Sequence, residues 1–187
     1  MPLPIAHACI GAGVATAIGP PSSDKNYSKL QLAAALLAVV PDLDFIFVWV
    51  LNWGPGWHRA FAHSIAFAAI VAFLAAFAFR TEWKRAALVL WAAMSSHALV
   101  DLLTSRLAPG AELFWPFYSG RYSAGFVDYL DFSIRVRGHL EFLFLIIKIS
   151  LVEAIVFIPL LLTIRLLMNR LKTQGACEPV IDHQEIG

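Results

Sequence analysis

Charged residues are scarce in this chain. They make up 14% of its 187 residues, whereas about one quarter of a soluble domain is charged. Hydrophobic residues make up 59%, and the mean hydropathy is +0.71. The core of a soluble protein of this length would not need so many apolar residues, so the composition indicates an integral membrane protein. The net charge is only +1, and no run of Lys and Arg alternates with aromatic residues, which argues against nucleic acid as a partner.

Cysteine is almost absent. Cys9 and Cys177 stand near opposite ends of the chain, which argues against a structural disulfide and against a thiolate metal site. The first nine residues contain no Lys or Arg, so the basic region that opens a signal peptide is missing there. We therefore expect the first apolar segment to be retained.

Apolar segments predict an all-α fold, a polytopic membrane helical bundle of about five transmembrane segments. About 20 helical residues cross roughly 30 Å of hydrocarbon, and the second segment is expected to break at Pro41, because proline removes a backbone hydrogen bond. Residues 1–171 would form one membrane-embedded domain, followed by a polar tail over 172–187. The expected segments cover residues 4–19, 29–51, 63–79, 86–104 and 140–167.

Basic residues predict the orientation of these segments. We call the side on which the first segment begins side A and the opposite side B. With five alternating spans, eight Lys and Arg residues fall on side B and five on side A. Because cytoplasmic loops carry the excess of positive charge, side B and the C-terminus should be cytoplasmic. The protein would lie in a bacterial cytoplasmic membrane with side A facing outward.

Histidines and aspartates lie in or beside the apolar segments, where ionisable groups are unfavourable and usually functional. His97 and Asp101 are spaced i, i+4, which puts them on one face of a helix. Asp42 and Asp44 follow Pro41, where a broken helix could let both carboxylates turn inward. Alternatives stay open: a hydrogen bond within the helix for the first pair, and a helix cap for the second.

The order of the segments brings these groups to side A. His7 opens the first segment, and His58 and His63 flank the start of the third. Asp42 and Asp44 lie near the side-A end of the second segment, and His97 and Asp101 near that of the fourth. At 1.5 Å per residue His97 would lie roughly 10 Å inside the helix end, in a sunken pocket. Imidazole and carboxylate ligands suit zinc, with manganese or iron as alternatives. The candidate metal ligands are His7, Asp42, Asp44, His58, His63, His97 and Asp101, with a packing role as the alternative for His7.

Other polar residues allow two interpretations each. Arg59 is either an interfacial anchor or a cation that binds an anion beside the metal. His139 is either a solvated helix start or a ligand, and Lys148 and Glu153 either snorkel or face the bundle. For the aromatic residues around Pro116, an interfacial belt is favoured over a substrate lid.

At these residues the sequence resembles the bacterial membrane-bound metal-dependent hydrolase family, which includes a LexA-regulated member. The resemblance covers about residues 4–116, and it departs at Ala60 and Ala62, where the family usually has Gly and Thr. That family also looks distantly similar to zinc-dependent phospholipase C and the zinc-dependent single-strand nucleases, an analogy at the level of fold. The matching pieces are His7, Pro41-Asp42-Leu43-Asp44, His58-Arg59, His63-Ser64, Ser96-His97, Asp101, Thr104, Leu113 and Trp115-Pro116.

The resemblance implies an enzyme, a metal-dependent hydrolase or phosphoesterase that acts through metal-activated water. The substrate would be an ester or phosphoester of a membrane lipid or lipid-like molecule. A carboxylate that the metal does not fully engage would be the base, with Asp44 as the candidate, and Arg59 would hold a phosphate. The alternatives are a metal-ion or proton-coupled transporter, because intramembrane His and Asp chains also serve transport, and a non-catalytic membrane protein with a structural metal.

Overall fold

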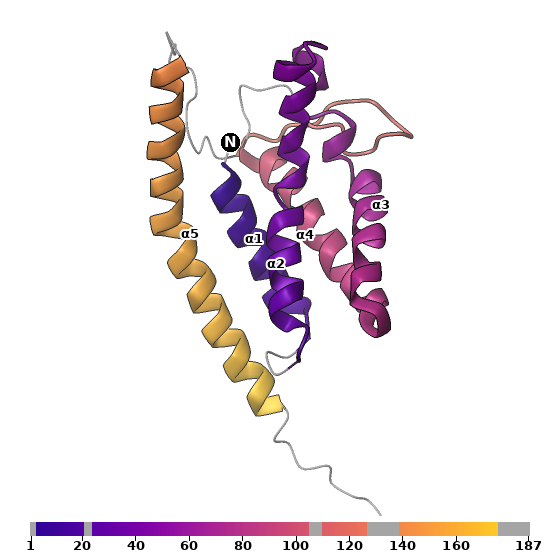
Figure 1. Ribbon diagram of the computed structural model, residues 1–187, viewed down its shortest axis with the longest axis vertical. Coiled ribbons are helices and arrows are strands. Elements are labelled where there is room, and N and C mark those ends of the chain that lie inside the picture. Colours follow the sequence, from indigo (N-terminus) through magenta and orange to yellow (C-terminus); the bar gives the residue numbers. More distant parts are fainter. Residues whose placement is uncertain (1–2, 21–23, 105–109, 127–138, 176–187) are drawn as a thin grey trace, which may run out of the picture.

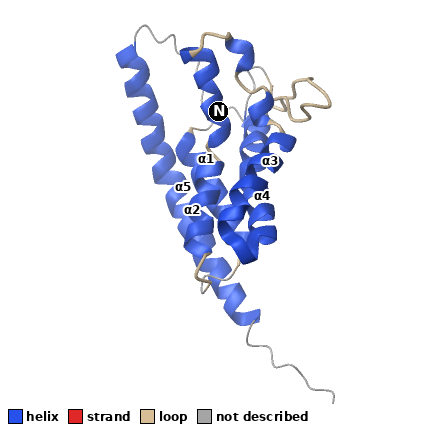
Figure 2. Ribbon diagram, turned by 45° about the vertical axis from the view of Figure 1, so that its right-hand side comes forward, coloured by secondary structure: helices blue, strands red, loops and turns tan. Residues whose placement is uncertain are grey.

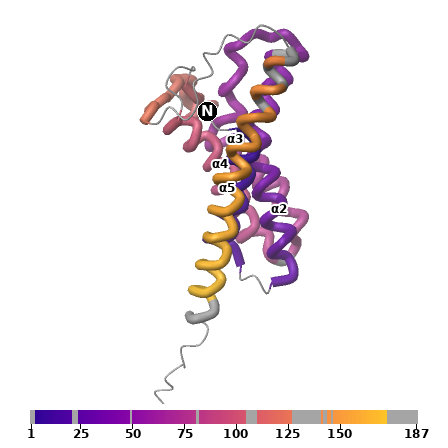
Figure 3. Tube along the Cα trace, turned by 90° about the vertical axis from the view of Figure 1, so that its left-hand side faces the viewer, coloured from indigo at the N-terminus to yellow at the C-terminus, as the bar shows by residue number. Residues whose placement is uncertain are grey.

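A computed structural model describes residues 3–20, 24–104, 110–126 and 139–175. Helices make up the regular structure of these ranges, and the β pairing among them is one isolated bridge between Ala111 and Tyr122. α1 lies at the centre, against α2, α4 and α5, and α3 packs on α4 (Figure 1). Figure 3, seen from the α5 side, shows α5 running along the outside of the bundle. The α-helices are α1 Pro4–Ile18, α2 Tyr27–Leu37, α3 Ile65–Ala76, α4 Trp83–Thr104 and α5 His139–Gly175.

The predicted all-α polytopic bundle is confirmed. Three helical segments are long and apolar enough to cross a membrane, namely Tyr27–Val48, Trp83–Thr104 and Ile147–Lys172. A fourth arises if Pro55–His63 and Ile65–Arg80, bent by 58°, count as one broken span. α1 has 15 residues, or about 22 Å of helix, which is shorter than the hydrocarbon layer. The first predicted span, residues 4–19, is therefore a short helix inside the bundle.

The second segment changes its helical geometry around Pro41, as predicted. The α-helix α2 ends at Leu37, and a tighter 3₁₀ turn, η1 Val40–Asp44, follows. A wider π turn, η2 Ile46–Val50, continues the segment. Proline has no N–H to donate to the carbonyl one turn earlier, so the α pattern cannot continue through it.

α5 is longer than the sequence pattern predicts. It runs for 37 residues, about 55 Å, and its C-terminal end projects beyond the other helices (Figure 2). Lys172, the first residue of the predicted polar tail, lies in this helix, and residues 176–187 of that tail lie outside the described ranges. The division into a membrane domain and a tail stays a prediction.

Alanine fills most of the space between α1, α2, α3 and α4. Small side chains let helix backbones approach closely, which is how helices pack when both they and the surrounding lipid are apolar. Gly11 shows how tight this contact is, because a Cβ atom there would lie 2.6 Å from the carbonyl oxygen of Ala34 and 2.5 Å from Cβ of Ala38. The buried core residues are Ala15, Leu30, Ala34, Ala72, Ala76, Ala86, Val89, Leu90 and Ala93.

Glu153 joins α5 to the start of α1. It is completely buried in a helix that otherwise exposes most of its side chains. Its carboxylate accepts hydrogen bonds from the backbone N–H groups of Leu3, at 2.5 Å, and Ala6, at 3.2 Å. α1 has no side-chain cap of its own, and the first N–H groups of a helix need acceptors. Glu153 therefore caps α1 from another helix, whereas Lys148 is exposed.

Replacing Glu153 should destabilise the fold. Glu153→Leu leaves two buried N–H groups without acceptors, so we expect the free energy of unfolding to fall by about 1–3 kcal/mol. Glu153→Gln keeps one acceptor oxygen, so its free energy of unfolding should fall by less. Denaturation by SDS in mixed micelles, followed by circular dichroism, measures both, with Lys148→Leu as the exposed control on the same helix. Equal stability of Glu153→Leu and the control would contradict the capping role.

Candidate metal centre

The seven predicted ligand residues lie in one cluster built from four parts of the chain. α1 brings His7, the turn η1 brings Asp42 and Asp44, and α4 brings His97 and Asp101. His58 and His63 come from the bent segment before α3, which contains the 3₁₀ turns η3 Pro55–Trp57 and η4 Phe61–His63. Five of the seven are 2% exposed or less, namely His7, Asp44, His63, His97 and Asp101.

His97 lies at the centre of the cluster in a defined tautomer. Its Nδ1 atom is 2.8 Å from the backbone carbonyl oxygen of Ala38. A carbonyl oxygen only accepts hydrogen bonds, so Nδ1 carries the proton and donates it. In the neutral ring Nε2 then has a free lone pair, which is the arrangement of a metal-binding histidine with a second-shell partner.

The Pro41 turn makes the Ala38 carbonyl available for this hydrogen bond. In an α-helix that carbonyl would accept from the N–H of Asp42, four residues later. In the 3₁₀ geometry Asp42 donates instead to the carbonyl of Val39, at 3.1 Å. The break at Pro41 thus turns a backbone acceptor towards His97. This is a contact that the sequence pattern did not reveal.

Several acceptor atoms converge on Nε2 of His97. Nε2 of His63 lies 3.1 Å away, Oδ1 of Asp42 3.4 Å and Oδ2 of Asp101 3.9 Å. Two ligands of a tetrahedral zinc ion, each about 2.0 Å from the metal, are about 3.3 Å apart. Oδ1 of Asp42 is buried without a hydrogen-bond partner in the described part of the chain. Because lone pairs repel one another, this arrangement favours a cation between them.

His7 belongs to the cluster but does not point to the same place as His97. The two rings are stacked, with centroids 3.8 Å apart and an interplanar angle of 23°. An imidazole binds a metal in its own ring plane, so two nearly parallel, stacked rings cannot both aim at one ion. Nε2 of His7 instead lies 3.5 Å from Oδ1 of Asp101, which favours a role in orienting that carboxylate.

Asp44 connects the histidines of the bent segment. Its Oδ1 atom is 2.8 Å from Nδ1 of His58, and its Oδ2 atom accepts from the backbone N–H of Arg59, at 2.7 Å, and lies 3.3 Å from Nδ1 of His63. A carboxylate on the far nitrogen of a metal-binding imidazole is a common second-shell arrangement. The geometry favours an orienting role for Asp44 and His58, and their assignment as ligands stays a prediction.

Arg59 is buried against the cluster. Its Nη2 atom lies 2.8 Å from Oδ2 of Asp101, and its side chain is 1% exposed. The sequence suggested a cation that anchors at the interface or holds a phosphate. The guanidinium faces a carboxylate of the cluster instead, which favours neutralising Asp101 over either role.

A loop over residues 110–126, for which the sequence favoured an interfacial belt over a substrate lid, covers this end of the bundle. The N–H of Glu112 donates to the carbonyl of Arg59, and the carbonyl of Leu113 accepts from the N–H of Ile65. Arg121 pairs with Glu112 at 3.1 Å and donates to the carbonyl of His58. The loop therefore fixes the backbone of the bent segment. His139 begins α5, and its side chain lies outside what the structure describes.

The cluster is least covered on one side. The side chains of Asp42 and His58 keep 9% and 13% exposure, more than the other five. The neighbouring surface is apolar, because Leu43, Ile46 and Trp53 are about half exposed. The partly open side of the cluster thus adjoins a surface that suits lipid.

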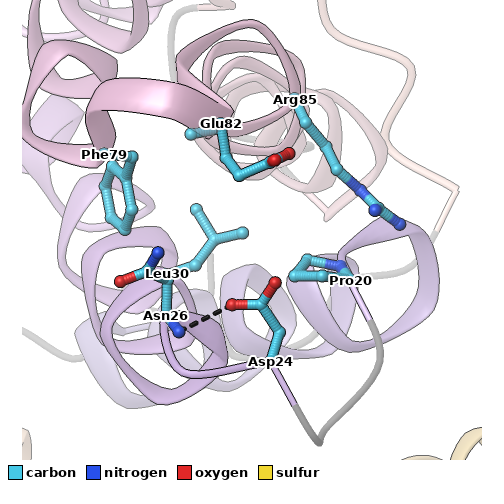
Figure 4. Close-up of a pocket in the computed structure, with 8 residues that line it drawn as sticks. Pro20, Asp24, Asn26, Leu30, Phe79, Glu82 and Arg85 are labelled. Atoms are coloured by element: carbon cyan, nitrogen blue, oxygen red, sulfur yellow. Dashed lines mark hydrogen bonds between the residues drawn. The ribbon is translucent and has the colours of Figure 1, made fainter.

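A small pocket lies at the other end of the bundle. Figure 4 shows it between the end of α1, the start of α2 and the start of α4, with the Asp24 carboxylate accepting from the N–H of Asn26. Its lining contains Glu82 and Arg85 but no histidine. The pocket lacks a set of His and Asp side chains like that of the ligand cluster, so the cluster remains the candidate site.

Comparison with known proteins agrees with a membrane location. The family model that matches residues 1–172 is described as YdjM inner membrane protein. The chain belongs to the YdjM inner membrane protein family. A curated relative, the inner membrane protein YbcI of Escherichia coli (strain K12), is 34% identical over 135 residues, which is 66% of this chain and 73% of the relative. No solved structure gives a significant match.

This finding corrects the family resemblance inferred from the sequence. The matching family is described as an inner membrane protein, and neither that description nor the name of YbcI includes a hydrolase or a metal. The motifs at His58 and His97 are short and occur in unrelated metal proteins, so they suggested the chemistry of a site and not the family. The YdjM match places the chain in the inner membrane.

Proposed function

We propose that this YdjM-family protein is a membrane-bound metal-dependent hydrolase, with the cluster around His97 as its metal centre. The observation that supports the proposal is the convergence of Nε2 of His97 and Nε2 of His63, 3.1 Å apart, with carboxylate oxygens of Asp42 and Asp101. Two imidazoles and two carboxylates match the hard and intermediate ligands of zinc, manganese and iron. Zinc fits best.

The cluster residues divide into ligands and residues that orient them. His63, His97, Asp42 and Asp101 would bind the ion. Asp44 would hold His63 and could accept a proton at its carboxylate, in agreement with its predicted role as a base. A bound divalent ion supplies an activated water molecule and polarises the oxygen of an ester or phosphoester.

A lipid-like substrate agrees with the surroundings of the cluster. The groups with residual exposure include Asp42, and Leu43 and Ile46, which follow it in the chain, have exposed apolar side chains. Trp53 and Trp57 are 53% and 39% exposed on the same segment, and tryptophan favours the membrane interface. An ester bond near the lipid headgroups would reach this side of the cluster without leaving the membrane.

The tight packing of the helices argues against the transporter alternative. A transporter needs a polar path to both sides of the membrane. Below the cluster, Gly11 packs directly on the backbone of α2, and the buried core is mostly alanine, valine and leucine. The polar residues Thr16 and Gln31 lie beyond this apolar layer and hydrogen-bond to each other at 2.6 Å.

The orientation of the chain is part of the proposal. The excess of basic residues on side B favours a cytoplasmic end of α5 and a cluster near the outer leaflet. Reporter fusions at the C-terminus test this placement. Fluorescence of a green fluorescent protein fusion without activity of an alkaline phosphatase fusion is the expected result, and the opposite pattern would reverse the orientation.

Elemental analysis with hydrolysis assays tests the function. Protein purified in detergent should contain zinc, manganese or iron and should hydrolyse phospholipids or generic phosphodiesters. Activity should disappear with a chelator and return with the metal. Metal without turnover on any ester or phosphoester would favour a structural metal, and protein without stoichiometric metal after reloading would exclude the proposal.

A further inference from the structure

Arg59 has a backbone conformation that arginine rarely adopts. Its φ angle is +61°, in the left-handed region that is disfavoured for side chains with a Cβ atom. Strain of this kind persists where the surrounding contacts fix the residue, often at functional sites. Here the N–H of Arg59 donates to Asp44, its carbonyl accepts from Glu112, and its guanidinium meets Asp101.

These contacts bring a fixed positive charge into an acidic cluster. Asp42, Asp44 and Asp101 carry three negative charges, and Arg59 carries one positive charge. With neutral imidazoles the cluster, counted over the described residues, has a net charge of −2. Buried charges in an apolar environment must be balanced, and one divalent cation balances this cluster, whereas two would leave it positive.

The ligand atoms also limit the number of ions. Two groups of residues could hold a metal: His7 with His97 and Asp101, and Asp42 with His63 and His97. Both groups need His97, whose Nδ1 atom is already bonded to the carbonyl of Ala38. The remaining lone pair on Nε2 binds one ion, so the two groups cannot both be filled, and the stacking of His7 on His97 favours the group of Asp42, His63 and His97.

We propose that the cluster is a single-ion centre in which Arg59 supplies the positive charge that a second metal ion would otherwise provide. Hydrolases with two metals use the second ion to neutralise carboxylates and to stabilise charge. Arg59 holds that position beside Asp101. Arg59 is therefore a positioning and charge-balancing residue. This inference rests on the proposed function only in taking the cluster as a metal site.

The proposal predicts how the number of ions depends on Arg59. Wild-type protein loaded with excess Zn²⁺ or Co²⁺ and then washed should hold one ion per chain. Arg59→Lys keeps the charge and should also hold one. Arg59→Met removes the charge and frees Oδ2 of Asp101, so we expect a second ion to bind Asp101 and His7 without using His97, and the number of ions should rise towards two. A purely structural role for Arg59 predicts the opposite, a loss of metal in Arg59→Met.

Mass spectrometry of the metal content per chain measures these numbers, and Arg85→Met is the control. Arg85 donates to the backbone carbonyl of Gly19 at the opposite end of the bundle, so its variant should keep one ion. If Arg59→Met does not fold, electron paramagnetic resonance of the Co²⁺-loaded wild type decides, because one isolated ion and a coupled pair give different spectra.

Two ions in the wild type, or one or none in folded Arg59→Met, would overturn the proposal. These outcomes separate it from the proposed function. One ion without hydrolysis would remove the hydrolase assignment and leave the single-ion centre. Hydrolysis with two ions would keep the hydrolase assignment and remove the single-ion centre. A wild type that binds no metal would remove both proposals.

Discussion

Replacing His97 with alanine should abolish metal binding. The variant removes Nε2, the atom on which the other ligands converge, and we expect less than about one tenth of an ion per chain and no hydrolysis. A ligand that binds only the folded state stabilises it by about 3–4 kcal/mol at 100 to 1,000 times its dissociation constant. A chelator should therefore destabilise the wild type by about that amount and His97→Ala hardly at all.

Metal analysis and SDS denaturation with and without chelator measure both effects. Ser96→Ala is the matched control, because it changes the neighbouring residue of α4, whose hydroxyl donates to the carbonyl of Ala93 in the same helix. This control should keep its metal and its response to the chelator. A His97→Ala protein with wild-type metal content would show that the ion lies elsewhere.

Replacing Asp101 with alanine should produce the largest loss of stability. The guanidinium of Arg59 would stay buried, at 1% exposure, without the carboxylate that lies 2.8 Å from it. Removing one partner of a buried ion pair destabilises by about 3–5 kcal/mol, because the remaining charge loses its directly bonded partner. We expect a decrease of that size in the free energy of unfolding, measured in chelator so that metal binding does not contribute.

A double variant separates the charge effect from lost packing. Asp101→Ala with Arg59→Met removes both charges, and apolar replacement of a whole buried pair is often nearly neutral. The double variant should therefore recover most of the stability that Asp101→Ala loses. Asp24→Ala, at the opposite end of the bundle, should change stability by less than about 1 kcal/mol. A double variant as unstable as Asp101→Ala alone would show that the ion pair is not the cause.

The sequence determined the residues of the candidate site because each of them is an ionisable residue in or beside an apolar segment. A histidine or aspartate in an apolar helix needs a partner, so His97 and Asp101 could be selected without a structure. Alternation of the helices across the membrane then brought these groups to one end of the bundle. The break at Pro41 also followed from the chemistry of a single residue.

The roles of these residues depended on contacts between distant parts of the chain. The Ala38 carbonyl that fixes the His97 ring is 59 residues away in sequence, and Glu153 accepts from the N–H of Leu3, 150 residues earlier, at the start of α1. No periodicity encodes such pairings, because they depend on how whole helices approach one another. The sequence suggested Arg59 as an interfacial anchor or a phosphate ligand, whereas in the structure its guanidinium contacts the carboxylate of Asp101.

The sequence by itself thus determined a helical membrane protein with a polar cluster at one end, because hydrophobicity and helix alternation are properties of local segments. Only the tertiary structure decided which nitrogen of His97 is free, that His7 stacks on it, and that Asp44 bonds to His58 and lies beside His63. The physical reason is that hydrogen bonds and ion pairs depend on distances of a few tenths of an ångström. Those distances are set by close helix contacts such as the one at Gly11.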